Sequence, residues 1–113
     1  MQGIDRFIET DTKAAYINQL LRVGFDSIDF GSFVSPKAIP QMRDTAEVLA
    51  KLDLSGTTTK LLAIVANERG ALDACRHPEI QYLGYPFSIS ETFQLRNTNA
   101  TIAESVERTK SIQ

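Results

Sequence analysis

The chain has almost none of the residues that support disulfide, nucleophile–histidine or zinc chemistry. Its 113 residues contain one cysteine, Cys75, and one histidine, His77. A single cysteine excludes an internal disulfide framework, so a reducing, cytoplasmic setting is the expected one. The sequence also lacks a Ser-His-Asp set, a Cys-His pair, zinc-ligand spacing and a glycine-rich phosphate loop.

Long apolar runs and an excess of positive charge are absent as well. No stretch approaches the roughly 20 apolar residues that cross a bilayer, and the first ten residues are unlike a signal peptide. The formal net charge is -2 and the pI is about 5.3, which argues against a nucleic-acid partner as the apolar pattern argues against a membrane. With 42% hydrophobic and 23% charged residues, one globular domain with a modest core is expected.

What the sequence does contain is a regular alternation of helical and extended patterns. Helical patterns cover residues 11–23, 44–52, 68–76 and 101–112, and extended patterns cover residues 27–31, 60–65 and 80–88. Asp11 or Thr12 is expected to cap the first helix and Gly24 to end it, with Ile17 and Leu21 on its buried stripe. The proline-bearing residues 32–42 and the polar residues 96–99 are expected to be loops.

This order of elements predicts a parallel sheet. Strands that alternate with helices pair in parallel through right-handed crossovers. The pattern fits either an open doubly wound sheet or a piece of a barrel. A complete barrel takes about 250 residues, so three strands would be only part of one.

Asp29 is the most informative residue at the carboxyl ends of the strands, where ligands bind in parallel α/β folds. Ile28 and Phe30 are expected on one face of the first strand. Asp29 and Gly31 are expected on the other. A carboxylate there is costly to bury unless it binds a cation or hydrogen-bond donors, so Asp29 is a candidate ligand for a divalent metal. The alternative is a structural Asp satisfied by backbone groups or an arginine.

Other polar residues follow the predicted strands. Ser32 closes the first strand and Asn67 the second, while the third is followed by Ser88, Ser90, Glu91, Arg96, Asn97 and Asn99. His77 lies in a connection at the opposite end of the sheet and is expected to be a surface residue. Cys75 lies on a helix face with Ala71 and Leu72 and is expected in the core.

The segment that follows the first strand is long and specific. Residues 32–42 read SFVSPKAIPQM, with Asp44 next, and they resemble the loop after the second barrel strand of the 3-hydroxy-3-methylglutaryl-CoA lyase family. AIVANERG at residues 63–70 resembles the family's third strand and the start of its next helix. Further matches, in order along the chain, are Met1-Gln2, Ser90-Glu91, Phe93, residues 97–99 and residues 102–105.

The resemblance implies a fold and an activity. The fold is a partial (β/α)8 TIM barrel of the α/β class, with about three parallel strands, and residues 1–113 form a single incomplete domain. The activity is cleavage of hydroxymethylglutaryl-CoA to acetyl-CoA and acetoacetate, a step of leucine degradation. It uses Mg²⁺ or Mn²⁺ and takes an acyl-CoA as partner.

Carried over residue by residue, the resemblance implies catalytic roles for Gln2, Asp29 and Ser32. Asp29 stands where the family usually has a Glu near the metal, so it is also the implied metal ligand. Gln2 matches a glutamine beside the family's catalytic Arg-Asp pair, and Ser32 lies beside the substrate position. Asn67, at a strand end, and Asn97, in the loop that the family places near the acyl-CoA, are the implied substrate-binding residues.

Several family residues have no counterpart in this sequence. The Arg-Asp pair would lie immediately before Met1, and the His-x-His metal ligands, a later asparagine ligand and the lid cysteine would follow Gln113. The expectation is a barrel fragment that is inactive alone. The alternatives are a non-catalytic half-barrel that associates, with itself or another chain, through unpaired strand edges, or another acyl-CoA lyase or synthase of the same superfamily.

Overall fold

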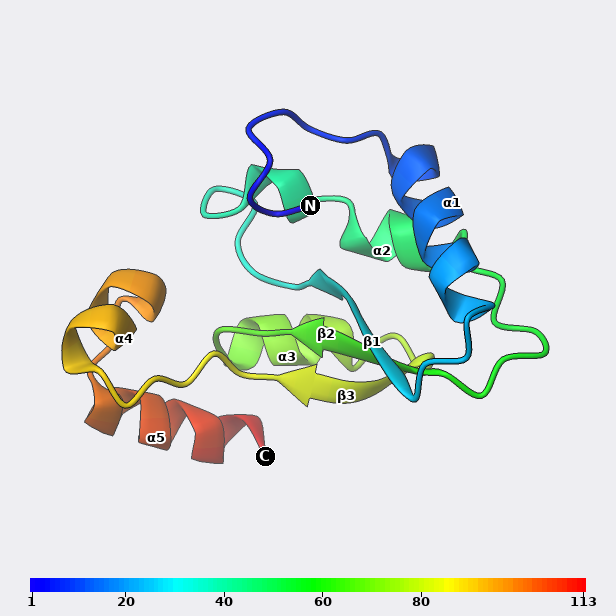
Figure 1. The fold of residues 1–113 in the computed structure, drawn as a ribbon. Helices are drawn as coiled ribbons and strands as arrows, with labels where there is room; N and C mark the ends of the chain where they lie inside the picture. The colour runs from blue at the N-terminus through cyan, green and yellow to red at the C-terminus, as the bar shows by residue number, and fades with distance from the viewer.

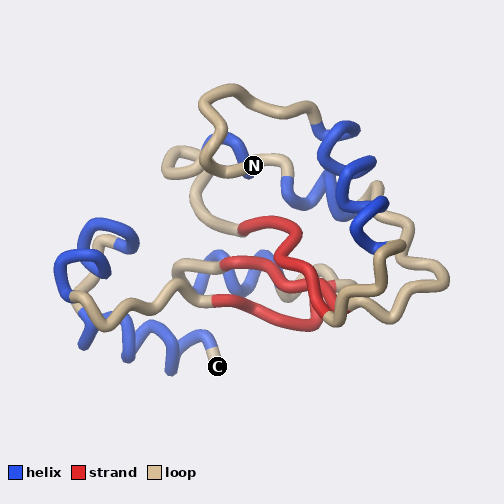
Figure 2. The backbone as a smooth tube through the Cα atoms, viewed as in Figure 1, coloured by secondary structure: helices blue, strands red, loops and turns tan.

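Three parallel strands form the centre of the structure, a computed structural model that describes residues 1–113. They are β1 (Ser27–Ser32), β2 (Lys60–Ile64) and β3 (Ile80–Gly84), and they lie side by side in that order (Figure 2). The helices are α1 (Thr10–Leu21), α2 (Thr45–Leu49), α3 (Glu68–Ala74), α4 (Glu91–Thr98) and α5 (Ile102–Ile112), with a short 3-10 turn η1 (Pro40–Met42). Each strand reaches the next through a helix, as parallel pairing requires.

The helices cover one face of the sheet. Ile28 and Phe30 of β1 pack with Leu61 and Ala63 of β2 against α1 and α2, and Val65 packs against α3. Figure 1 shows α1 and α2 beside β1 and α3 alongside the strands, with α4 and α5 beyond the carboxyl end of β3. The other face carries the half-exposed Leu62 and Ile64 and the exposed side chains of Asp29 and Tyr82. Helices on a single face match the wall of a barrel, because a doubly wound sheet has helices on both.

The first helix buries the stripe that its sequence predicts. Ile17 is 3% exposed and Leu21 is 4% exposed, which confirms their place in the core. The helix begins earlier than predicted, at Thr10, and neither Asp11 nor Thr12 caps it: Glu9 precedes it without a side-chain cap. Gly24 lies just beyond the helix at φ 87°, a conformation that glycine adopts without strain.

A bulge in β1 changes which side chains share a face. Asp29 pairs with Leu62, but the next pair along the ladder is Gly31 with Ala63, so Phe30 is the extra residue. The prediction that Gly31 shares the face of Asp29 is therefore wrong. A Cβ atom on Gly31 would lie 2.6 Å from Cγ2 of Thr45 in α2, so Gly31 faces the helices. Ser32, opposite Ile64, comes instead onto the open face with Asp29.

The second half of the chain departs from two sequence predictions. On α3 the buried residues are Gly70, Ala71 and Ala74, while Leu72 is 61% exposed and Cys75 is exposed. The placement of Cys75 in the core was wrong, because the helix presents its small residues to the sheet. His77, expected at the surface, is half-buried with its ring 5.5 Å from that of Phe33.

Helix α4 occupies residues that were predicted to be a loop. The strand β3 ends at Gly84, before Pro86, and α4 then runs from Glu91 to Thr98. The Oγ of Ser90 caps it by accepting a hydrogen bond from the Phe93 amide, and Asn99 ends it in the left-handed conformation. Gln94 is its only buried residue, so the apolar periodicity that marks most helices is missing from the sequence. None of the helices combines the length and hydrophobicity needed to span a membrane.

Candidate functional site

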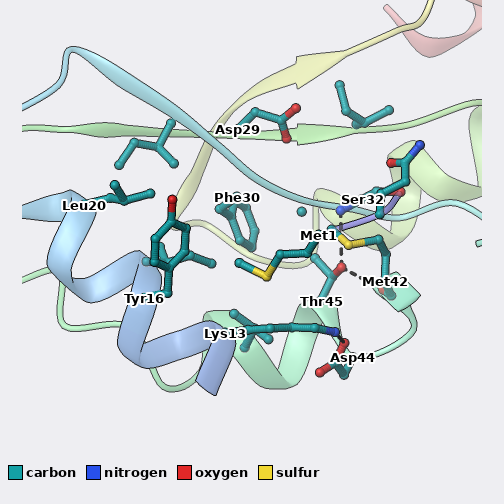
Figure 3. Close-up of a pocket in the computed structure, with 16 residues that line it drawn as sticks. Met1, Lys13, Tyr16, Leu20, Asp29, Phe30, Ser32, Met42, Asp44 and Thr45 are labelled. Carbon is teal, nitrogen blue, oxygen red and sulfur yellow. Dashed lines mark hydrogen bonds and ion pairs between the residues drawn. The ribbon is translucent and has the colours of Figure 1, made fainter. Parts of the chain in front are cut away.

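A pocket of about 340 Å³ lies along β1, between that strand, α1, α2 and the first two residues of the chain (Figure 3). Gln2, Asp29 and Ser32, the three residues with predicted catalytic roles, all line it. They come from the N-terminal segment, the middle of β1 and the end of β1, so only the folded chain brings them together. Its apolar wall comes mainly from the core side chains of α1, β1 and α2.

Asp29 lies on the open face of the sheet. In Figure 3 its carboxylate and the ring of Phe30 lie on opposite sides of β1, as strand alternation predicts for these two residues. Partial burial of the carboxyl group raises its pKa above the ordinary value, although a hydrogen bond with the Gly31 backbone acts in the opposite direction. Partial desolvation therefore favours the protonated form of Asp29, and a hydrogen-bond donor or a cation beside it would favour the charged form.

Ser32 is held in place through both its backbone and its side chain. Its amide donates to Oγ1 of Thr45 at 3.2 Å, and its Oγ accepts from the Val34 amide at 3.3 Å. Thr45 in turn donates to the Met42 carbonyl at 2.8 Å. The start of α2 thus holds the end of β1, and the hydrogen of the Ser32 hydroxyl stays free for another acceptor.

A buried ion pair forms another part of the pocket wall. Nζ of Lys13 lies 2.5 Å from Oδ1 of Asp44, and the two side chains are 4% and 9% exposed. Asp44 also accepts from the Thr10 hydroxyl at 2.7 Å, and Lys13 donates to the Gln41 carbonyl. Burial opposes ionisation of Asp44, but its hydrogen bonds with Lys13 and Thr10 outweigh that effect and lower its pKa.

Sequence reasoning did not identify this pair. The signal was present, because Lys13 lies directly beside Ala14 and four residues before Ile17 on the buried stripe of α1. A lysine on such a stripe needs a buried partner. The ring of Phe7 packs against the lysine of the pair, with its centroid 4.2 Å from Nζ of Lys13, and also against Arg43, 3.6 Å from its Cζ.

The two predicted substrate-binding residues lie away from this pocket. Asn67 precedes α3, and its Oδ1 accepts from the Gly70 amide at 2.9 Å, so the side chain caps that helix. It lines a second hollow of about 360 Å³ beside residues 33–37. Asn97 is an exposed residue of α4, in a helix where a loop was expected.

These residues do not by themselves form a site for Mg²⁺ or Mn²⁺. No three side chains of His, Cys, Asp or Glu converge anywhere in the chain. Asp44, the other carboxylate of the pocket, is already neutralised by Lys13. Mg²⁺ holds its waters unless several oxygen ligands converge, so a lone Asp29 is expected to bind it weakly.

Several known proteins similar to this chain are hydroxymethylglutaryl-CoA lyases. The hydroxymethylglutaryl-CoA lyase YngG of Bacillus subtilis is 36% identical over 112 residues, covering 99% of this chain and 37% of that protein. A 3-hydroxy-3-isohexenylglutaryl-CoA/hydroxymethylglutaryl-CoA lyase of Pseudomonas aeruginosa is 36% identical over 108 residues, covering 96% of this chain and 35% of that protein. The chain thus spans little more than a third of the length of these relatives. No protein-family model matches it.

Solved structures agree in fold as well as in sequence. The lyase of Brucella melitensis superposes with a TM-score of 0.91 at 36% identity, covering 98% of this chain and 38% of that one. The lyase of Acinetobacter baumannii, solved with coenzyme A and 3-methylmalate, gives a TM-score of 0.90 at 36% identity, with 98% and 36% coverage. The expectation that the three strands correspond to part of such a barrel is confirmed.

Proposed function

Because this chain is homologous to the hydroxymethylglutaryl-CoA lyases over nearly its whole length, we propose that it contributes part of the active site of such a carbon–carbon lyase. The substrate is hydroxymethylglutaryl-CoA, and the products are acetyl-CoA and acetoacetate, as in leucine degradation. The observation that supports the proposal is the pocket along β1, which Gln2, Asp29 and Ser32 all line. Its setting is the cytoplasm, and a gene product found in an organelle or outside the cell would contradict that part.

The chemistry available to these three residues is hydrogen bonding to a substrate. Ser32 can donate its hydroxyl hydrogen to a substrate oxygen, because its Oγ accepts from the Val34 amide and donates to no group of the chain. Asp29 offers a carboxylate that can accept from the hydroxyl group of the substrate, and Gln2 offers an amide in the pocket lining. Asn67 and Asn97 are proposed to contact parts of the substrate farther from this pocket.

The ions implied by the family resemblance, Mg²⁺ or Mn²⁺, would find one carboxylate here, that of Asp29. When bound, such an ion polarises substrate oxygens. Its other ligands would come from outside these 113 residues, since no cluster of ligands exists among them.

A chimera tests the proposal. The matching third of the Bacillus subtilis lyase is replaced by these 113 residues, and release of acetoacetate from hydroxymethylglutaryl-CoA is measured. We expect turnover in the chimera, and a loss of turnover and of Mn²⁺ affinity when Asp29→Asn is added. Asp26→Asn, at an exposed position just before β1, is the matched control and should leave both unchanged. A folded chimera without activity would refute the lyase function, and equal behaviour of the two variants would make Asp29 structural.

A second candidate function, an assembly module, has its own observation. β1 and β3 each pair with β2 alone, so both outer edges of the sheet carry unpaired backbone groups. Tyr82, exposed on β3, lies on the open face. Sedimentation of the purified chain at rising concentration should show association, and Tyr82→Lys should weaken it by adding charge at that edge. A chain that stays monomeric at all concentrations would refute the assembly module, and the lyase role would be the remaining candidate.

A further inference from the structure

The hydroxyl group of Thr45 connects the start of α2 to the end of β1. We propose that Thr45 is a positioning residue, which holds Ser32 on the face of Asp29 so that the Ser32 hydroxyl can reach a substrate oxygen. The inference rests on the proposed lyase function and adds to it the residue that fixes the position of Ser32. Thr45 acts in this role through Ser32 and needs no contact with the substrate.

The Thr45 hydroxyl has a fixed orientation. It donates its hydrogen to the Met42 carbonyl at 2.8 Å, and its oxygen accepts from the Ser32 amide at 3.2 Å (Figure 3). A hydroxyl group offers one hydrogen and two lone pairs, so it can serve both partners at once. Thr45 and Ser32 are each 5% exposed. Loss of the Thr45 hydroxyl would leave the buried Ser32 amide without an acceptor, which favours a shift of the end of β1.

Asp44, the residue before Thr45, anchors this part of the chain to α1. Its carboxylate accepts from Lys13 at 2.5 Å and from the Thr10 hydroxyl at 2.7 Å. Its backbone carbonyl accepts from the Val48 amide at 2.9 Å, within the first turn of α2. Thr45 therefore follows a residue that is fixed through both its side chain and its backbone, and it transmits that fixed position to Ser32.

The close approach of β1 to α2 depends on Gly31. A Cβ atom at this position would lie 2.6 Å from Cγ2 and 3.0 Å from Oγ1 of Thr45. The φ angle of Gly31 lies outside the left-handed region, so alanine would add this contact without backbone strain. Gly31→Ala should therefore push the Thr45 side chain away from the Ser32 amide.

A double-mutant cycle in the chimera with the Bacillus subtilis lyase tests the proposal. Ser32→Ala, Thr45→Val and their combination are compared by kcat/KM for hydroxymethylglutaryl-CoA. Valine keeps the shape of threonine without the hydroxyl group, and Ser32→Ala keeps the backbone amide that Thr45 holds. Thr59→Val is the matched control. Thr59 is also buried, and it donates to the Phe25 carbonyl at 2.7 Å, but it lies before β2 and does not line the pocket.

We expect Ser32→Ala to lower kcat/KM about tenfold, the effect of losing one hydrogen bond to the substrate. Thr45→Val should lower it by a similar factor in the parent chimera, and by less than about twofold in the Ser32→Ala variant, because both changes act through one hydroxyl group. Thr59→Val should lower the Tm and leave kcat/KM unchanged. An equal loss from Thr45→Val with and without Ser32 would show a purely structural role and overturn the inference while the lyase function stands. A folded parent chimera without turnover would refute both together.

NMR spectra of the purified 113-residue chain test the geometry without any activity. The Ser32 amide hydrogen should exchange with solvent about tenfold faster in Thr45→Val than in the parent, because its acceptor is lost. Thr45→Ser keeps the hydroxyl group and should exchange like the parent. Gly31→Ala should also speed the exchange, and adding Thr45→Ser should restore part of the protection, since serine lacks Cγ2. Exchange of the Ser32 amide that is unchanged in Thr45→Val would overturn the inference.

Discussion

At the scale of single residues, Lys13 and Asp44 carry the greatest energetic consequence. Both side chains are buried, and both form hydrogen bonds with other segments of the chain. Through these bonds they connect α1, η1 and the start of α2. Removal of one partner leaves the other charged, buried and unpaired. Such a change commonly costs more than the net contribution of the pair itself.

We therefore predict that Lys13→Met lowers the free energy of unfolding by about 3–5 kcal/mol, because Asp44 would stay charged and buried. Lys51→Met is the control, because its partner Asp11 is exposed; it should cost less than about 1 kcal/mol. Urea denaturation of both variants measures the difference. Similar losses in the two would show that burial of the first pair has no energetic effect.

Asp29 gives a residue-scale prediction about pH. Its pKa is raised in the folded chain, so ionisation of the carboxyl group disfavours the folded state as the pH rises through that pKa. Asp29→Asn should therefore increase the stability at neutral pH. The gain should vanish as the pH falls below the ordinary Asp pKa, where the carboxyl group is protonated in both states.

Denaturation curves for Asp29→Asn and the parent, recorded from acid to neutral pH, check the sign. A pH-independent difference would mean that the carboxyl group is not desolvated. If Asp29→Asn also lowers turnover in the chimera, the carboxyl group of Asp29 contributes to activity while it lowers the stability of the folded chain.

At the scale of elements, Gln94 holds the loop after β3, α4 and α5 together. It is fully buried, and its Oε1 accepts from the Ser88 amide at 2.6 Å. Its Nε2 lies within hydrogen-bond distance of Oγ of Ser105 at 2.7 Å, Oγ1 of Thr98 at 2.9 Å and the Pro86 carbonyl at 3.3 Å. Helix α4 has almost no apolar face, so this amide replaces a hydrophobic contact.

Gln94→Leu should lower the free energy of unfolding by about 1–3 kcal/mol or more, because it leaves several buried polar groups without a partner. Gln19→Leu, on the exposed side of α1, should change stability by less than about 0.5 kcal/mol. Hydrogen exchange should report the loss first in residues 86–105. Protection there equal to that of the parent would refute the role of Gln94.

At the scale of the whole molecule, the chain is a sheet covered by helices on one face only. Its radius of gyration is 14.6 Å, above the roughly 13 Å typical of a domain of about 100 residues, and its dimensions are 41 × 30 × 23 Å. Only 22 of 113 residues are buried, and the open face of the sheet has no covering layer. The buried residues therefore concentrate between the helices and one face.

The 113-residue chain alone should release no acetoacetate from hydroxymethylglutaryl-CoA. The physical reason is that Asp29 is the one carboxylate of the pocket that has no ion-pair partner, and a single carboxylate holds a metal ion weakly. The chain contains no other cluster of metal-binding side chains. The Bacillus subtilis lyase under the same conditions is the positive control. Release above a no-protein control would refute the prediction.

The sequence by itself determined the alternation of three strands with helices, although it missed α4 and extended β3 too far. Hydrophobic periodicity located β1, β2 and the buried stripe of α1, because burial on one face leaves a repeat that can be counted. The motif from Ser32 to Met42 indicated the family, and the relatives bear it out. The candidate residues Gln2, Asp29 and Ser32 also came from the sequence, and all three line one pocket.

Only the tertiary structure decided which side chains share a face and which polar groups are buried. The bulge at Phe30 brings Ser32 to the face of Asp29 and turns Gly31 toward Thr45, which alternation along a strand cannot foresee. The pairing of Lys13 with Asp44 and the hydrogen bonds of Gln94 join residues 31 and 11 positions apart. Such contacts depend on where the chain returns in space, and local periodicity carries no information about that.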